Sequence, residues 1–178
     1  MKKQIFTPMN LTIVGMVVLA AMARFMPHPP AFSPIAAMAI FGGAYFAKKS
    51  WALVLPLVVM LATDAYFGYY PEMWGVYIPF IIAGCLGFLL RKKVTVLRVG
   101  GICLSSSLIF FLISNFAVWL GGLCAYPMNF SGLITCYAMG LPFFRNEVLG
   151  TLVYSGVMFG AFELAKLYLP SLSPNKVK

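Results

Sequence analysis

The sequence alternates long apolar blocks with short clusters of basic or polar residues. Apolar runs such as Trp51–Ala62 and Ile78–Leu90 are too long for a soluble core, and they lack the apolar–polar alternation of membrane barrel strands. A helix needs about 20 apolar residues to cross the hydrocarbon of a bilayer, and fewer where the bilayer is thin. The pattern therefore predicts an all-α, polytopic membrane protein, with residues 1–178 forming a single transmembrane domain.

We expect about six transmembrane helices packed in one bundle. They are predicted at residues 10–26, 33–47, 51–69, 75–90, 99–121 and 147–169. The second span is short and contains Gly42 and Gly43, so we expect it to be tilted or buried among its neighbours. The outer connection at residues 122–146 is rich in Tyr, Phe, Cys and Pro, which argues against disorder. We expect this connection to pack over the bundle as a lid or a re-entrant segment.

The basic residues fall mainly on one side of this topology. With six spans, one side carries Lys2, Lys3, Lys48, Lys49, Arg91, Lys92, Lys93, Arg98, Lys166, Lys176 and Lys178, and the other only Arg24 and Arg145. The positive-inside rule then places both chain ends on the cytoplasmic side of a bacterial cytoplasmic (inner) membrane. Because topology explains the net charge of +9, nucleic acid is not an expected partner.

Ionisable and aromatic residues gather toward the outer side of the predicted bundle. Asp64 and Arg24 lie at similar depth, and an ionisable group in a membrane usually faces a cavity or a partner. An Arg24–Asp64 pair would either join two helices or contact a ligand. The aromatic residues would form an interfacial belt or line a pocket for a flat ligand. The candidate ligand-binding residues are Arg24, His28, Asp64, Tyr69, Trp74, Tyr77, Asn115, Trp119, Tyr137 and Arg145.

The sequence contains no arrangement typical of an enzyme or of a resident cofactor. Glu72, Glu147 and His28 are conceivable acid–base partners, but nothing in the sequence fixes their geometry. The four cysteines match no zinc motif. Cys124 and Cys136 would form a disulfide, or one thiolate or His28 would ligate a metal, or neither would occur. We therefore expect a protein that is not an enzyme and that carries no cofactor.

Two stretches resemble the substrate-binding S components of energy-coupling-factor (ECF) vitamin transporters. They are Phe32-Ser-Pro-Ile-Ala-Ala-Met-Ala-Ile-Phe-Gly-Gly-Ala-Tyr-Phe, and the segment that ends the third span with Asp64-x-x-x-Gly68. Ser114-Asn-Phe-Ala-Val-Trp-Leu and residues 136–146 resemble a related, uncharacterised bacterial membrane family. The resemblance implies that a vitamin-like molecule binds near the outer face, with Asp64 and Tyr69 at matching positions.

The same resemblance implies partners and a candidate ligand. S components dock a transmembrane coupling subunit, which works with ATPases, often through an Ala-x-x-x-Ala pattern in the first span. This chain has Ala20, Ala21 and Ala23, with Arg24 where an alanine would complete the pattern. BtuM-type cobalamin carriers act without a dedicated module and ligate cobalt through a cysteine. By that similarity cobalamin is one candidate ligand, and the candidate cobalt ligands are Cys85, Cys124, Cys136 and His28.

These observations favour an uptake protein that is embedded in the membrane and captures a vitamin-like small molecule from the outer side. One alternative is a membrane enzyme acting on a lipid-linked substrate through Asp64, His28 or Glu72. Another is a structural or assembly subunit, which would bind a protein partner and no ligand. Retention of a vitamin-sized molecule by the purified chain distinguishes the first hypothesis from the other two.

Overall fold

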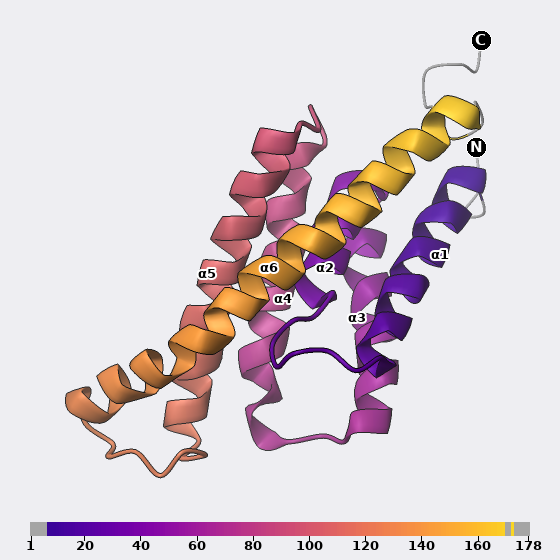
Figure 1. The fold of residues 1–178 in the computed structure, drawn as a ribbon. Helices are drawn as coiled ribbons and strands as arrows, with labels where there is room; N and C mark the ends of the chain where they lie inside the picture. The colour runs from indigo at the N-terminus through magenta and orange to yellow at the C-terminus, as the bar shows by residue number, and fades with distance from the viewer. Residues whose placement is uncertain (1–6, 170–171, 173–178) are drawn as a thin grey trace.

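The computed structural model describes residues 7–169 and residue 172, and this part of the chain consists of helices and loops (Figure 1). The main helices are α1 (Pro8–Met22), α2 (Ile35–Tyr45), α3 (Lys49–Phe67), α4 (Trp74–Gly87), α5 (Val96–Leu120) and α6 (Phe130–Tyr168). Three short 3-10 turns adjoin them: η1 (Ala23–Phe25), η2 (Pro71–Met73) and η3 (Phe88–Leu90). The all-α prediction is confirmed for these residues.

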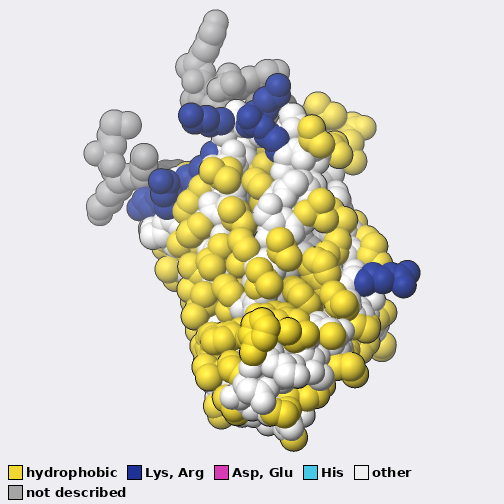
Figure 2. Space-filling view, turned by 90° about the vertical axis from the view of Figure 1, so that its left-hand side faces the viewer, with side chains coloured by type: hydrophobic (Ala, Val, Ile, Leu, Met, Phe, Trp, Pro, Cys, Tyr) yellow, Lys and Arg dark blue, Asp and Glu magenta, His cyan; other side chains and the backbone are white. Residues whose placement is uncertain are grey.

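Five helical segments are long and apolar enough to cross a membrane. They are Pro8–Phe25, Lys49–Phe67, Pro71–Leu90, Val96–Leu120 and Phe130–Tyr168. Their outward faces carry large apolar side chains, among them Leu19, Val157 and Leu164, and Figure 2 shows apolar side chains covering most of one side of the molecule. Because such a surface is unfavourable in water and favourable in lipid, the chain is a membrane protein.

The two ends of the bundle differ in charge. Helix α1 begins and α6 ends at the same end, and basic side chains gather there in Figure 2. We call this the basic end; it includes Lys48, Lys49, Arg91, Lys92, Lys93 and Lys166. The opposite end, the loop end, holds the connections α1–α2, α3–α4 and α5–α6. Lys2, Lys3, Lys176 and Lys178, which also entered the prediction of sidedness, lie outside the described residues.

Helix α2 is short and lies inside the bundle. Its 11 residues span about 16 Å, roughly half the thickness of the hydrocarbon layer. Every residue from Ala36 to Tyr45 is buried, and α1, α3, α4, α5 and α6 all contact the helix. The expectation of a short, buried element is confirmed, but the predicted span 33–47 is reduced to Ile35–Tyr45. The connection before α2 therefore enters the bundle from the loop end (Figure 1).

Helices α2 and α4 pack with their backbones in direct contact. A β-carbon added to Gly43 would lie 2.2 Å from the carbonyl oxygen of Gly84, and one added to Gly87 would lie 2.3 Å from that of Ile40. No larger residue fits at either position without moving a helix, so these glycines permit the close approach. The contact fixes the central helix against α4.

The structure contradicts the prediction that residues 122–146 form a lid or a re-entrant segment. Only the stretch between α5 and Phe130 is a connection, and α6 is one helix of 39 residues rather than the predicted span 147–169. The Asn129 side chain accepts a hydrogen bond from Gly132 N at 2.9 Å, which caps the helix at its start. At about 58 Å, α6 is longer than the hydrocarbon is thick, and it crosses the bundle obliquely in Figure 1.

Candidate functional site

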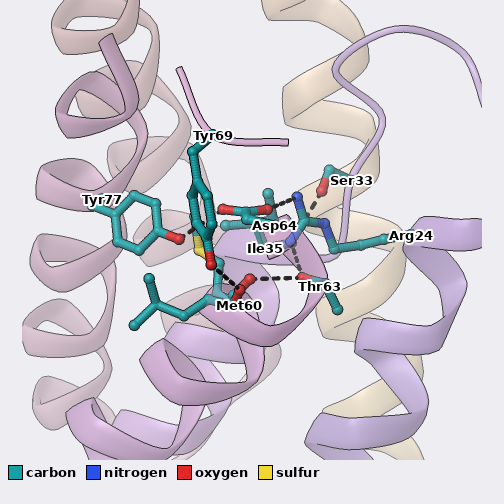
Figure 3. Close-up of polar contacts among 9 residues, drawn as sticks. Arg24, Ser33, Ile35, Met60, Thr63, Asp64, Tyr69 and Tyr77 are labelled. Atoms are coloured by element: carbon teal, nitrogen blue, oxygen red, sulfur yellow. Dashed lines mark hydrogen bonds and ion pairs between the residues drawn. The ribbon is translucent and has the colours of Figure 1, made fainter. Parts of the chain in front are cut away.

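A group of buried and half-buried polar side chains joins α3 and α4 to the turn after α1, toward the loop end (Figure 3). Arg24, in the turn that extends α1, lies 2.6 Å from Asp64 Oδ1 through Nη2 and donates to Thr63 Oγ1 through Nη1. Tyr77 in α4 donates to Asp64 Oδ2 at 2.7 Å. We call these four residues the charge cluster. The expected Arg24–Asp64 ion pair is confirmed, and it lies at the contact of three helices.

Each group in the charge cluster has a partner. Both carboxylate oxygens of Asp64 accept a hydrogen bond, and Thr63 also donates to the carbonyl of Met60 at 2.8 Å. The side chains of Arg24 and Asp64 are only 13% and 8% exposed. A paired, hydrogen-bonded arrangement compensates much of the cost of burying two charges, so the cluster holds α1 and α3 together.

Exposed aromatic side chains surround the charge cluster. Phe25 stacks on Phe67 and meets Tyr66 edge to face, with ring centroids 5.2 and 5.1 Å apart, and the Arg24 guanidinium lies 5.3 Å from the Phe67 ring. Helix α3 ends at Gly68, whose φ of +94° favours glycine, and the chain turns there. Tyr69 and Tyr70 follow this turn and are 64% and 47% exposed.

Tyr70 lies within electrostatic reach of the cluster. Burial of part of its side chain, and then the negative charge of Asp64, raise the pKa of the Tyr70 phenol. The phenol is therefore protonated and remains available as a hydrogen-bond donor at neutral pH. We call Phe25, Tyr66, Phe67, Tyr69 and Tyr70 the aromatic rim. Of this group only Tyr69 was among the ligand-binding candidates predicted from the sequence, where the resemblance to S components placed it at a matching position.

Three further candidates form hydrogen bonds with backbone carbonyls on or next to α5. Asn115 donates to Phe111 O at 2.8 Å, Trp119 donates to Pro127 O at 3.1 Å, and Tyr137 donates to Leu112 O at 2.8 Å. Among the described residues no hydrogen bond, ion pair or ring contact connects them to the charge cluster. The Asn115 bond lies within α5, whereas the Tyr137 bond joins α6 to α5 and the Trp119 bond joins α5 to the connection before α6.

The remaining candidates are separate from both groups. His28 is exposed, and its ring nitrogen lies 3.1 Å from the carbonyl of its neighbour Pro29. Arg145 is exposed on α6 and forms no ion pair with any described residue. Trp74 begins α4 and is 37% exposed. The structure therefore brings only Arg24, Asp64, Tyr77 and the adjacent Tyr69 into one region.

The cysteines are free thiols in the structure. Cys85 and Cys124 are exposed, whereas Cys103 and Cys136 are buried, so the alternative of a Cys124–Cys136 disulfide is not formed. The Cys136 thiol donates to the carbonyl of Asn115 at 3.4 Å. Within residues 7–169 and 172, no group of three or more His, Cys, Asp or Glu side chains is placed to hold a metal ion.

A cavity of about 340 Å³ lies at the basic end, although we expected a pocket on the outer side. Its polar walls include Lys166, which lies 2.6 Å from Glu163, and Tyr45, which also donates to Glu163. Arg91 closes one side and donates to the carbonyl oxygens of Gly43 and Phe46 at 2.9 and 2.8 Å. Arg91 thus satisfies carbonyl groups left free where α2 ends.

Sequence reasoning did not recognise a polar seam between α5 and α6. Glu147 Oε1 accepts from Thr151 at 2.9 Å and lies 3.5 Å from Ser107 Oγ, while the Cys103 thiol donates to Ser155 at 3.2 Å. All five side chains are buried. The sequence signal that could have revealed the seam is a spacing of four residues, which separates residues 103 and 107 on α5 and residues 147, 151 and 155 on α6. This spacing places each set on one helix face.

Comparisons with known proteins identify one family. A model for a family of unknown function, DUF6580, matches residues 4–172. No curated protein and no solved structure matches the chain. Because the family model covers almost the whole chain, the protein belongs to this family of unknown function, DUF6580.

Proposed function

We propose that this protein captures a small solute at the loop end of its bundle, as an uptake protein embedded in the membrane and similar to an ECF S component. The observation that carries the proposal is a buried Arg24–Asp64 pair bordered by exposed aromatic side chains. Charged groups at membrane depth are costly and commonly mark a substrate path. A rim of exposed aromatic rings next to such a pair offers a stacking surface and polar anchors together.

The expected ligand is a vitamin-like molecule with a flat ring and polar substituents. Its ring would stack on Tyr69 and Tyr70, and a polar substituent would exchange hydrogen bonds with Asp64 or Tyr77. Cobalamin is one candidate. Of the candidate cobalt ligands, Cys85, Cys124 and His28 are exposed, and Cys124 and His28 lie in connections at the loop end. Cys136 is buried and hydrogen-bonded to the backbone, so it would have to change partner before it could ligate cobalt.

Energy for uptake would come from a partner such as a transmembrane coupling subunit with ATPases. Ala20 and Ala21 are 8% and 2% exposed, so they already pack within the bundle. A coupling subunit that docks on α1 would therefore meet exposed residues of that helix, such as Leu19 and Met22. The proposed partner thus needs a docking pattern different from the alanine pattern of the resembled family.

Ligand capture by the purified chain tests the proposal. The protein is purified in mild detergent and examined by native mass spectrometry, first as isolated and then with a panel of vitamins that includes cobalamin. We expect one ligand bound per chain. We expect Asp64→Asn to weaken binding by at least about tenfold, which corresponds to one lost charge-assisted hydrogen bond of about 1.4 kcal/mol or more.

A matched variant separates a local effect from a general one. Glu163→Gln removes the carboxylate of the other ion pair, at the opposite end of the molecule, and should leave binding unchanged. A chain that retains nothing from the lysate and binds no member of the panel would contradict the proposal. Equal losses in Asp64→Asn and Glu163→Gln would contradict the assignment of the site to the loop end.

A further inference from the structure

Glu147 differs from the other acidic residues in its surroundings. The chain has four Asp and Glu residues, and two of them form ion pairs, Asp64 with Arg24 and Glu163 with Lys166. Glu72 packs against Gly121 at the loop end and is partly exposed. Glu147 is 5% exposed, lies near the middle of α6, and has no cationic partner among the described residues. Its electrostatic environment therefore needs an explanation of its own.

The groups that face Glu147 are hydroxyls. Ser107 from α5 and Thr151 from α6 both direct a hydroxyl toward Oε1, and no described residue donates a hydrogen bond to Oε2. Two neutral donors cannot balance a full negative charge in a helix interface inside a membrane, where a carboxylate costs about 3 kcal/mol or more. A proton on Oε2 removes the charge and keeps both hydrogen bonds to Oε1.

The surroundings offer no other counter-charge. The nearby titratable group of α5 is the Cys103 thiol, and the other ionisable group of α5, Arg98, is exposed at the basic end. Helix α2 contributes only Tyr45, which donates to Glu163 near the far end of α6. Arg145 precedes Glu147 on α6 but is exposed. One carboxylate with two hydroxyls also supplies fewer oxygens than the six or more of a Ca²⁺ or Mg²⁺ shell.

Glu147 also lies between two contacts that hold the connection before α2. Asn146 donates to the carbonyl of Pro30 at 3.0 Å. On the next turn, a β-carbon added to Gly150 would lie 2.9 Å from Ser33 N, so α6 touches this connection directly. An ionised Glu147 would need water, and that water would enter the seam beside both contacts.

We propose that Glu147 is a proton-binding site within the membrane, and that loss of its proton opens the α5–α6 seam to water. The site consists of Glu147 with Thr151 and Ser107, and its ligand is a proton taken up from water. The inference stands apart from the proposed solute binding, because the site lies in a different helix pair. Its test requires no solute, so the two proposals can fail separately.

Infrared spectroscopy tests proton binding directly, because a protonated carboxyl group has a carbonyl stretch distinct from that of a carboxylate. We expect the purified wild-type protein to show a protonated-carboxyl band at neutral pH, and Glu147→Gln to lose it. Glu72→Gln and Glu163→Gln are the matched controls and must keep that band. A wild-type spectrum without the band, or a band that survives Glu147→Gln, would overturn the proposal.

A second variant keeps the test valid if Glu147→Gln does not fold. Glu147→Asp retains the acid but shortens the side chain by one methylene, which weakens its contact with Thr151. The band should then persist at a shifted frequency. A band at the wild-type frequency in Glu147→Asp would assign the proton to another residue and overturn the proposal.

The buried Cys103 reports whether the seam opens. In a background with Cys85, Cys124 and Cys136 replaced by serine, its reaction with a membrane-permeant maleimide is followed against pH. This rate is divided by the rate measured in the same background carrying Glu147→Gln, which cancels the pH dependence of the thiol itself. We expect this ratio to rise by about tenfold per pH unit while Glu147 ionises, as the ionised fraction does. A ratio that stays constant with pH would overturn the coupling between the proton and the seam.

Discussion

Arg24 and Asp64 show how a few polar side chains control a contact between helices in an apolar bundle. Arg24 contacts Asp64, Thr63 and the ring of Phe67 at once, so its guanidinium is held on several sides. Asp64 in turn accepts from Tyr77. Removing Arg24 or Asp64 leaves the other charge without its ionic partner, and that loss exceeds the net value of the pair itself.

We therefore expect strong coupling between Arg24 and Asp64. Arg24→Ala and Asp64→Asn should each lower the free energy of unfolding by about 3 kcal/mol, because each leaves an unpaired buried group. The double variant should lose clearly less than the sum of the two. The measurement is a double-mutant cycle of unfolding in detergent. Strictly additive losses would show that the two side chains do not interact.

The more exposed ion pair of α6 provides the control for this cycle. Lys166 and Glu163 have side chains 24% and 45% exposed and lie three residues apart on one helix. Solvent screens such a pair, so Lys166→Ala and Glu163→Gln should show a coupling energy below about 1 kcal/mol. A coupling as large as that of Arg24 and Asp64 would mean that burial does not set the strength of these pairs.

At the scale of elements, the position of α2 depends on glycine. Gly43→Ala should lower the free energy of unfolding by about 1–3 kcal/mol, because its β-carbon would meet the backbone of α4. Gly156→Ala on α6 is the matched control, since an added β-carbon there has no neighbour within 4 Å. Alanine also favours a helix over glycine, so Gly156→Ala should be neutral or stabilising. Unfolding in detergent measures both, and equal effects would contradict the packing of α2 on α4.

The end of α2 depends on a basic residue rather than on a cap within the helix. Arg91→Ala should lower the free energy of unfolding by about 2–4 kcal/mol, because two charge-assisted hydrogen bonds to Gly43 and Phe46 are lost. Lys92→Ala changes the same charge at an exposed position and should alter stability by less than about 0.5 kcal/mol. The two variants are compared in the same unfolding titration. Similar effects in the two variants would mean that Arg91 acts only as a positive charge that sets topology and does not stabilise the end of α2.

Apolar blocks and flanking charges predicted most of the elements, and α6 shows where that reasoning stops. Pro142, Arg145 and Asn146 are typical of a loop, yet they lie within one helix. The feature that indicates a continuous helix here is the spacing of four residues between Gly132, Cys136 and Gly140, all of which are buried. At Gly140 an added β-carbon would lie 2.4 Å from the Asn115 side chain. Such a repeat indicates a buried helix face only when the neighbouring helix is known. The sequence does not show where that helix lies.

The candidate site, too, could be predicted from the sequence only in part. The Arg24–Asp64 pair could be predicted, because membrane burial makes each residue costly without the other. The seam around Glu147 could not, since Ser107 lies 40 residues away on another helix and single hydroxyls in apolar helices usually bond to their own backbone. Likewise, Asn115 and Trp119 were predicted as ligand-binding candidates, but their hydrogen-bond partners are backbone carbonyls.

At the scale of the whole molecule, charge and fold lead to the same expectation for sidedness. The start of α1 and the end of α6 lie together at the basic end (Figure 1), so we expect the α1–α2 connection and α2 together to make up one crossing. Helix α2 alone is too short for that crossing, so part of it would be made by the non-helical chain before α2, of which residues 26–30 are exposed and residues 31–33 are half-buried. Such chain occurs at membrane depth only where protein or a water-filled cavity surrounds it.

This arrangement predicts opposite locations for two positions in intact cells. Cys124 is exposed in the connection between α5 and α6, and Lys92 is exposed in the basic turn after η3. Because basic turns remain cytoplasmic, an impermeant maleimide should label a chain whose only cysteine is Cys124, but not a cysteine-free chain carrying Lys92→Cys. Permeabilised cells should label both, which controls for folding. Labelling of Lys92→Cys alone in intact cells would reverse the topology and move the charge cluster to the cytoplasmic side, where it could not capture a solute from outside.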